Sequence, residues 1–195
     1  MSRDVDLIER KTLSDGYFHV ERVTVKHRLF AGGWSRPVTR EIVQRGHAVG
    51  ILPYDPVRDE VVLVKQFRVG PWQAGDDPWL VETVAGIVEG GETAEDVACR
   101  EAIEECGCTI ARLHHVCDYY SSPGMLDERV ALYCGITDTS KAGGVHGLDH
   151  EGEDIEAFVR RRDDAWTDLE EGLFTDPKLL ILLPWLQRNR KMLQS

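Results

Sequence analysis

Several features that would place the chain in a membrane or on nucleic acid are missing from its sequence. No stretch approaches the run of about 18 apolar residues that a transmembrane helix needs. The first residues have no apolar core of a secretory signal. Positive charge is scarce, since 23 Lys and Arg stand against 34 Asp and Glu, with a formal net charge of −11 and a pI of about 5.1. We therefore expect neither a membrane nor nucleic acid as a partner.

Cysteine is also scarce, and its number is odd. Five cysteines without a secretion signal favour reduced thiols and a cytoplasmic location. Cys106 and Cys108 stand close together, but no second pair with zinc-ligand spacing exists, so buried thiols are expected. Hydrophobic residues make up 42% of the chain, which is ordinary for a globular protein and argues against disorder.

Short segments with the composition of strands are interleaved with a few helical segments. Strands are expected at residues 17–28, 36–44, 48–52, 60–67, 80–86, 131–136 and 155–161. Helices are expected at residues 93–106 and 163–172 and from Pro177 to about Leu193, with a kink or break at Pro184. Residues 71–78 and 141–154 are expected to be loops, the second one mobile. This order predicts an α/β or α+β sandwich, with residues 1–45 as a small β domain and residues 46–195 as the main domain.

The helix at residues 93–106 has recognisable signals at both ends. Thr93 and Asp96 resemble a capping box, with Asp in place of Glu or Gln. Gly107 fits the position just after the helix end. Apolar residues such as Val97 and Ala102 supply the stripe that the helix buries.

The same helix carries an unusual amount of negative charge. Glu101 and Glu105 are four residues apart and share a face, and Glu104 borders it. Like charges at this spacing destabilise a helix by roughly 0.2–0.5 kcal/mol per pair. The helix dipole also disfavours anions near the C-terminal end. A divalent cation that prefers oxygen ligands, Mg²⁺ or Mn²⁺, offsets this cost. For an isolated motif of this kind, a solvated acidic face is the alternative.

The spacing around this helix resembles the Nudix box, G-x5-E-x7-R-E-U-x-E-E-x-G-U, in which U is an apolar residue. Seven identities match at fixed spacing: Gly86, Glu92, Arg100, Glu101, Glu104, Glu105 and Gly107. The small residues Ala102 and Cys108 occupy the two U positions. The chain therefore resembles the Nudix hydrolases. That resemblance implies an α/β/α sandwich with a mixed β-sheet, in which helix carboxylates hold divalent metal against a diphosphate.

The resemblance also implies roles for individual residues. The implied metal ligands are the Ala85 carbonyl, Glu101, Glu105 and Glu153, with two or three Mg²⁺ or Mn²⁺ ions in each site. The implied catalytic residues are Glu92, Arg100, Glu104 and Glu151. Glu92 and Arg100 are expected to pair and hold the loop, Glu104 to lie in or near the metal shell, and Glu151 to activate water. Whether Glu151 or another residue is the base stays open, and both loop glutamates fit a solvated polar loop as well.

Segments outside the box resemble bacterial members of the ADP-ribose pyrophosphatase branch. These segments are residues 40–49, 66–68, 121–129 and 146–155, and the resemblance runs over roughly residues 10–193. It implies hydrolysis of ADP-ribose to AMP and ribose 5-phosphate. The implied substrate-binding residues are Tyr17, Phe18, Arg40, Glu41, Arg45, Arg68, Ile87, Ser122, Pro123, Gly124 and Glu128. Aromatic strand residues also fit a plain core, and the arginines also fit an ordinary surface.

In this branch the N-terminal strands are exchanged between two subunits. The resemblance therefore implies a homodimer in which Tyr17, Phe18, Arg45 and Glu128 reach the site of the partner. Two other functions stay open. One is the hydrolysis of another nucleoside diphosphate sugar, such as GDP-mannose. The other is a non-catalytic Nudix module that senses ADP-ribose, although the three intact box glutamates argue against it.

Overall fold

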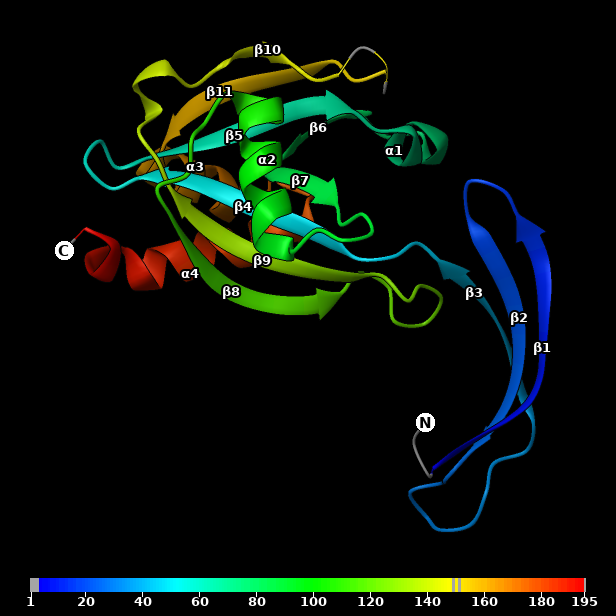
Figure 1. Cartoon of the computed structure of the whole chain (residues 1–195). Coiled ribbons are helices and arrows are strands. Elements are labelled where there is room, and N and C mark those ends of the chain that lie inside the picture. Colours follow the sequence, from blue (N-terminus) through cyan, green and yellow to red (C-terminus); the bar gives the residue numbers. More distant parts are fainter. Residues whose placement is uncertain (1–3, 149, 151, 195) are drawn as a thin grey trace. The chain divides into compact units, whose positions relative to one another are not determined.

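The computed structural model describes residues 4–148, 150 and 152–194 (Figure 1). The chain divides into two compact units. The N-terminal unit runs to His47 and includes Tyr119–Val130. The main unit comprises Ala48–Asp118 and the chain from Ala131 onward.

The N-terminal unit is built on a three-stranded antiparallel sheet in the order β1-β2-β3. Its strands are β1 (Val5–Asp15), β2 (His19–His27) and β3 (Val38–Gln44). Strand β1 was not expected, because register shifts after Leu7 and Thr12 interrupt the alternation that marks a strand. Residues 119–130 join this unit through a parallel bridge between Val43 and Leu126.

The main unit contains an eight-stranded sheet. The order β10-β11-β5-β4-β9-β8 forms its path, β6 pairs with β5, and β7 pairs with β4. The strands are β4 (Ala48–Asp55), β5 (Glu60–Phe67), β6 (Trp79–Glu82), β7 (Val84–Ile87), β8 (Arg112–Tyr120), β9 (Arg129–Ile136), β10 (Gly144–His146) and β11 (Ile155–Arg161). The single strand expected at residues 80–86 is split at Thr83, and β10 lies inside the segment expected to be a mobile loop.

Helices cover both faces of this sheet (Figure 1). They are α1 (Val69–Ala74), α2 (Ala94–Cys106), α3 (Arg162–Glu170) and α4 (Pro177–Leu193), with the short 3₁₀ helix η1 (Thr139–Lys141). Helix α2 lies in front of the sheet and α3 behind it. The predicted α/β sandwich with a small N-terminal antiparallel sheet is thus confirmed. One detail was wrong, because the expected loop at 71–78 begins inside α1. Helix α4 continues through Pro184, so of the kink or break expected there the break is excluded.

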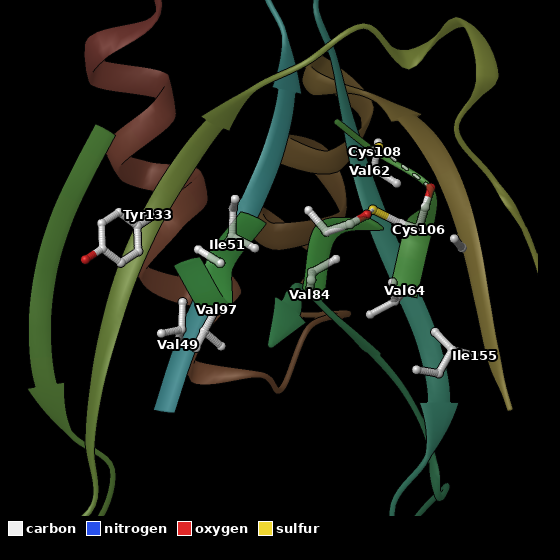
Figure 2. Close-up of a cluster of buried hydrophobic side chains, with 13 residues drawn as sticks. Val49, Ile51, Val62, Val64, Val84, Val97, Cys106, Cys108, Tyr133 and Ile155 are labelled. Atoms are coloured by element: carbon white, nitrogen blue, oxygen red, sulfur yellow. Dashed lines mark hydrogen bonds between the residues drawn. The ribbon is translucent and has the colours of Figure 1, made fainter. Parts of the chain in front are cut away.

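The main core lies between α2 and the sheet (Figure 2). Val97 and Ala102 of α2 pack against strand residues such as Ile51 and Val64. Cys106 and Cys108 are buried in this core, as expected, and all five cysteines are free thiols. None of the helices in the described part of the chain is both long and apolar enough to cross a membrane.

Candidate active site

Helix α2 has both of the end signals that its sequence predicts. The Thr93 side chain accepts a hydrogen bond from the Asp96 N–H at 3.2 Å, and the Asp96 carboxylate accepts one from the Thr93 N–H at 3.3 Å. This confirms the capping box. Gly107 ends the helix in the left-handed conformation, with φ 68°. The caps fix the length and register of the helix, so the face that carries Glu101 and Glu105 is turned toward β7.

Glu105 is the most deeply buried acid of α2, with 3% of its surface exposed. Its Oε2 accepts a hydrogen bond from the Ala85 N–H of β7 at 3.1 Å. Burial raises the pKa of Glu105 to about 8, the Ala85 bond works against this shift, and the charges of Glu101 and Glu153 add to it. A carboxylate in this position is readily ionised at neutral pH only when a cation lies beside it.

Glu101 lies directly against the backbone of β7. A Cβ atom added at Gly86 would stand 1.9 Å from Oε1 of Glu101, so the glycine makes room for this carboxylate. Burial raises the pKa of Glu101 to about 7, the charge of Arg100 lowers it, and that of Glu104 raises it. Ile87, which was assigned to the substrate pocket, ends β7 and is partly exposed.

Arg100 connects three carboxylates. Its Nε donates to Glu92 at 3.2 Å, and its Nη1 donates to Glu101 and to Glu104, both at 2.9 Å. The predicted contact between Glu92 and Arg100 is therefore present, and it ties the loop before α2 to the helix. One guanidinium offsets part of the repulsion among the glutamates.

The donor chemistry of this group fits a divalent cation. In residues 4–148, 150 and 152–194, no group of three or more His, Cys, Asp or Glu side chains is arranged so that it could hold a metal ion as it stands. Arg100 occupies the carboxylates of Glu101 and Glu104 instead. The available donors are nevertheless all oxygens, and they include the buried carboxylate of Glu105 and the partly buried carboxylate of Glu101, which pairs with Arg100. Oxygen donors of this type suit Mg²⁺ and Mn²⁺.

Glu153 lies in the segment between β10 and β11. Its Oε2 accepts a hydrogen bond from the Leu148 N–H at 3.1 Å. Gly147 has φ 106°, and a Cβ there would come within 2.8 Å of the Glu153 Cβ, so this turn requires glycine. The charge of Glu153 contributes to the raised pKa of both Glu101 and Glu105. Glu151, the expected base, lies outside the described residues.

Arg68 belongs to a buried network that the sequence did not reveal. It donates to Glu82 through Nε at 2.6 Å and through Nη2 at 3.0 Å. Lys178 also donates to Glu82, at 3.3 Å, and to Asp176, at 2.7 Å. The sequence held one signal of this network: Glu82 stands among apolar residues of a strand, and an acid buried there needs a cation beside it. The partner Lys178 is distant in sequence, so only the fold identifies it.

Four expected substrate residues lie together in the N-terminal unit. Tyr17, 82% exposed, and Phe18 form the turn between β1 and β2 rather than part of a buried strand, so the core alternative is wrong for Tyr17. The Arg45 guanidinium carbon lies 5.8 Å and 5.3 Å from the centroids of their two rings. Arg45 also pairs with Glu128 at 3.5 Å. These are the four residues expected to reach a partner subunit.

The remaining expected substrate residues also lie in the N-terminal unit. Arg40 is exposed on β3 and donates to the Thr39 carbonyl at 2.8 Å, and the neighbouring Glu41 pairs with Arg22 at 2.6 Å. A turn beyond β8 contains Ser122, Pro123 and Gly124, and the Ser122 carbonyl accepts hydrogen bonds from the Met125 and Leu126 N–H groups. The expected site residues are therefore divided between the two units.

Comparison with known proteins adds independent findings. Residues 44–186 match the family model described as NUDIX domain. An ADP-ribose pyrophosphatase of Escherichia coli (strain K12) is 45% identical over 192 residues, which cover 98% of this chain and 92% of the relative. An ADP-ribose pyrophosphatase of Haemophilus influenzae is 42% identical over 196 residues, with coverages of 99% and 90%.

More distant similarities agree with these findings. A GDP-mannose pyrophosphatase of Enterobacter sp. (strain 638) is 34% identical over 189 residues, which cover 96% of this chain and 97% of the relative. A solved structure described as "Crystal structure of ADP compounds hydrolase" has a TM-score of 0.69 at 19% identity and 96% coverage of both chains, which shows a shared fold. The box residues, the sandwich and the matched relatives lead to one conclusion: the chain belongs to the NUDIX domain family.

Proposed function

We propose that this chain hydrolyses the diphosphate of ADP-ribose to AMP and ribose 5-phosphate, with a divalent cation bound at α2. The observation that carries the proposal is the group of carboxylates on α2 that faces β7: Glu105 is buried, Glu101 is largely buried with 13% of its side chain exposed, and burial raises the pKa of both. The 42–45% identity to proteins named ADP-ribose pyrophosphatase, over nearly the whole chain, supports the choice of substrate.

Residues of α2 and β7 hold the cation in this proposal. Glu101 and Glu105 are its ligands, with the Ala85 carbonyl and Glu153, and Glu104 lies at the edge of the group. With two or three Mg²⁺ or Mn²⁺ ions held there, the site would offset the negative charge of the diphosphate and make bound water more acidic. The Ala85 N–H keeps the Glu105 carboxylate in a fixed orientation. Arg100 holds Glu92 and the helix glutamates in place.

Water attack on phosphorus requires a group that accepts a proton. We assign this task to Glu151, on the polar segment that also carries Glu153. A carboxylate is a weak base, so Glu151 would take its proton from water that a bound cation would make more acidic. Arg68 supplies a cation for the substrate phosphates, and Ile87 lines the pocket next to it.

The N-terminal domain, residues 1–45, completes the site in this proposal. Tyr17 and Phe18 stack the adenine, while Arg40, Glu41 and Arg45 contact the substrate. Ser122, Pro123, Gly124 and Glu128 close on the terminal ribose. The chain forms a homodimer by exchange of N-terminal strands, and Tyr17, Phe18, Arg45 and Glu128 serve the site of the partner. A cytoplasmic location is part of the proposal and rests on the five free cysteines.

A substrate panel tests the proposed activity. Purified protein with Mg²⁺ is incubated separately with ADP-ribose, GDP-mannose, NADH and diadenosine polyphosphates, each with an EDTA control. We expect EDTA-sensitive hydrolysis of ADP-ribose, with release of AMP, at a far higher rate than hydrolysis of the other compounds. If GDP-mannose is the preferred substrate, the proposed metal site is supported. The assignment of residues 40–49, 66–68, 121–129 and 146–155 to the ADP-ribose branch is then wrong.

Of the two alternatives, one has an observation in its favour. The 34% identity to a GDP-mannose pyrophosphatase keeps other nucleoside diphosphate sugars in consideration. A sensor role is favoured only if the protein binds ADP-ribose tightly and hydrolyses none of the panel. The presence of Glu101, Glu104 and Glu105 supports catalysis over sensing.

A further inference from the structure

Glu82 is a buried acid that two cations share. It ends β6, and only 4% of its surface is exposed. Its Oε1 accepts a hydrogen bond from Arg68 Nε at 2.6 Å, and its Oε2 accepts bonds from Arg68 Nη2 at 3.0 Å and Lys178 Nζ at 3.3 Å. Burial raises the pKa of Glu82, but the Arg68 bond and the Lys178 charge outweigh this, and the pKa is lowered overall. The carboxylate is therefore ionised and fixed at both oxygens.

Lys178 is held rigidly on its other side. It occupies the first turn of α4, and its side chain is 15% exposed. Its Nζ also bonds Asp176 at 2.7 Å, the residue whose side chain caps the same helix. Its stem passes over β4, where a Cβ added at Gly50 would stand 2.9 Å from the Lys178 Cδ. Because both partners are buried and the stem is enclosed, the ammonium group has little freedom to move.

Asp176 links the same network to the strand that carries the proposed metal site. Its Oδ2 accepts a hydrogen bond from the Thr83 N–H at 3.2 Å, and the Thr83 hydroxyl donates to the Ile51 carbonyl. Thr83 directly precedes β7, whose Ala85 binds Glu105. The start of α4 therefore holds both the Glu82 carboxylate, which binds Arg68, and strand β7, which faces α2.

Arg68 is placed to act on a diphosphate. Its Nε and Nη2 are both used by Glu82, so the Nη1 edge of the guanidinium lies outside this bidentate pair. Its side chain is 43% exposed, and its charge acts on Glu105, where it lowers the pKa. A guanidinium with one edge anchored and another accessible is suited to phosphate oxygens.

We infer that Lys178 is a positioning residue: by holding the Glu82 carboxylate, it fixes the plane of the Arg68 guanidinium, which then binds the substrate diphosphate. This inference rests on the proposed function, since it takes ADP-ribose as the ligand of Arg68. Without the ammonium group, Glu82 keeps only Arg68 and both side chains can rotate together. The diphosphate then meets a guanidinium in many orientations, and its binding weakens.

The test compares three changes in α4 with the unchanged chain. Lys178→Met removes the ammonium group, Lys178→Arg keeps a cation, and Lys191→Met makes the same change at an exposed lysine in the last turn of the same helix. We expect Lys178→Met to raise KM for ADP-ribose about tenfold while kcat changes less than about threefold. Lys178→Arg should recover most of the loss, and Lys191→Met should equal the unchanged chain.

A second readout does not depend on turnover. Calorimetry measures the Kd of a non-hydrolysable ADP-ribose analogue with a methylene bridge between the phosphates, in the presence of EDTA. We expect the Kd to rise by a similar factor in Lys178→Met. If that variant does not fold, Lys178→Gln, which keeps an uncharged donor on a shorter stem, is compared with Lys178→Arg in the same way.

The outcomes separate this inference from the proposed function. An unchanged KM and Kd in Lys178→Met overturn the positioning role, and so does a lower Tm with no change in either constant. Equal losses in Lys178→Met and Lys178→Arg overturn it as well. An unchanged chain that binds the analogue but does not hydrolyse ADP-ribose overturns the proposed activity only, because the Kd comparison still decides the role of Lys178.

Discussion

Glu105 is the residue on which the proposed metal site depends most. Within the described residues its carboxylate accepts one hydrogen bond, from Ala85, and it lies in a position where burial opposes ionisation. A buried anion without a cation costs free energy, so the metal-free protein carries a penalty at any pH at which Glu105 is ionised. Binding a cation removes that penalty, so metal binding also raises the stability of the folded protein.

The pH dependence of stability in EDTA follows from this penalty. The pKa of Glu105 is raised from 4.5 to about 8, so the folded protein retains a proton that the unfolded chain has released. The protonated Glu105 carboxyl therefore contributes fully to the stability of the folded state below about pH 4.5, and this stability is lost as the pH rises through about 8. We expect Glu105→Gln to have the Tm of the unchanged chain near pH 5 and a higher Tm near about pH 9. Differential scanning calorimetry checks this, and a lower Tm of the variant near about pH 9 contradicts the account.

Gly86 is predicted to matter for the metal more than for the fold. In Gly86→Ala the new Cβ would overlap both the carboxylate and the Cγ of Glu101, so the whole Glu101 side chain has to turn away from β7. We expect a loss of stability of no more than about 1 kcal/mol but a loss of kcat/KM of about a hundredfold or more. Urea denaturation and steady-state kinetics measure the two effects. A variant with unchanged kcat/KM would show that the position of Glu101 does not control activity.

At the scale of elements, the sequence predicts best what local interactions decide. Helix α2 was predicted because its caps, Thr93 with Asp96 and Gly107, lie within the helix or next to it. The division between β6 and β7 was not predicted, because Thr83 is held by Asp176, which is 93 residues away. Helix α1 was missed because its Gly70 and Pro71 are typical of loops.

The site residues show the same difference between local contacts, which the sequence predicts, and contacts between distant segments, which it does not. The box glutamates were selected from their spacing along one helix, and the Arg100 contact with Glu92 follows from the same local pattern. Glu82 and Lys178 were missed because their contact joins β6 to α4, and no periodicity in the sequence records it. Buried networks of this kind become visible only once the fold brings their members together.

Asp55, at the turn between β4 and β5, tests how far one buried charge stabilises this turn. Asp55 ends β4 and accepts hydrogen bonds from the Val57 N–H at 2.8 Å and the Thr139 N–H at 3.1 Å. Burial raises the pKa of Asp55, but the bonds from Thr139 and Arg58 outweigh it and lower the pKa to about 2. The stability that the carboxylate adds is present above pH 3.8 and is lost as the pH falls through about 2.

We therefore expect Asp55→Asn to lower the free energy of unfolding by about 1–2 kcal/mol at neutral pH. The difference from the unchanged chain should shrink as the pH falls from 3.8 through about 2, because Asp55 then becomes protonated and is uncharged like the asparagine. Urea denaturation over this range measures it. A difference that is the same at both ends of the range would mean that charge has no part in the effect.

At the scale of the whole molecule, the expected site residues belong to two compact units. Arg45 contacts both Tyr17 and Glu128 in the N-terminal unit, whereas the glutamates of α2 lie in the main unit. The sequence does not reveal that residues 119–130 join the N-terminal sheet, because the bridge of Val43 to Leu126 connects distant segments. The proposed exchange of strands between subunits explains why one chain carries both the substrate-contacting residues of the N-terminal unit and the glutamates of α2.

The N-terminal unit exposes apolar side chains that a dimer would cover. They include Val5, Leu7, Ile8, Leu13, Leu29 and Phe30. Four of these side chains lie on β1, and Leu29 and Phe30 lie in the segment between β2 and β3. Such a set of exposed apolar side chains is typical of an interface. We expect light scattering to give twice the chain mass of 22.0 kDa. We also expect Leu7→Lys to give monomers with at least about tenfold lower kcat/KM.

Leu173→Lys is the matched control, because it makes the same change at an exposed leucine of the main unit. It should leave both the mass and kcat/KM unchanged. A monomeric chain with full activity would remove the dimer and the role of Tyr17, Phe18, Arg45 and Glu128 at a partner site.

The most direct test of the central claim is the rate of AMP release from ADP-ribose with Mg²⁺, measured side by side for the unchanged chain and Glu105→Gln. The account predicts EDTA-sensitive release by the unchanged chain. It also predicts a loss of kcat of about a thousandfold or more in a variant whose circular dichroism spectrum is unaltered. A Glu105→Gln protein that releases AMP at a near-normal rate would contradict the claim that the carboxylates of α2 hold the catalytic metal.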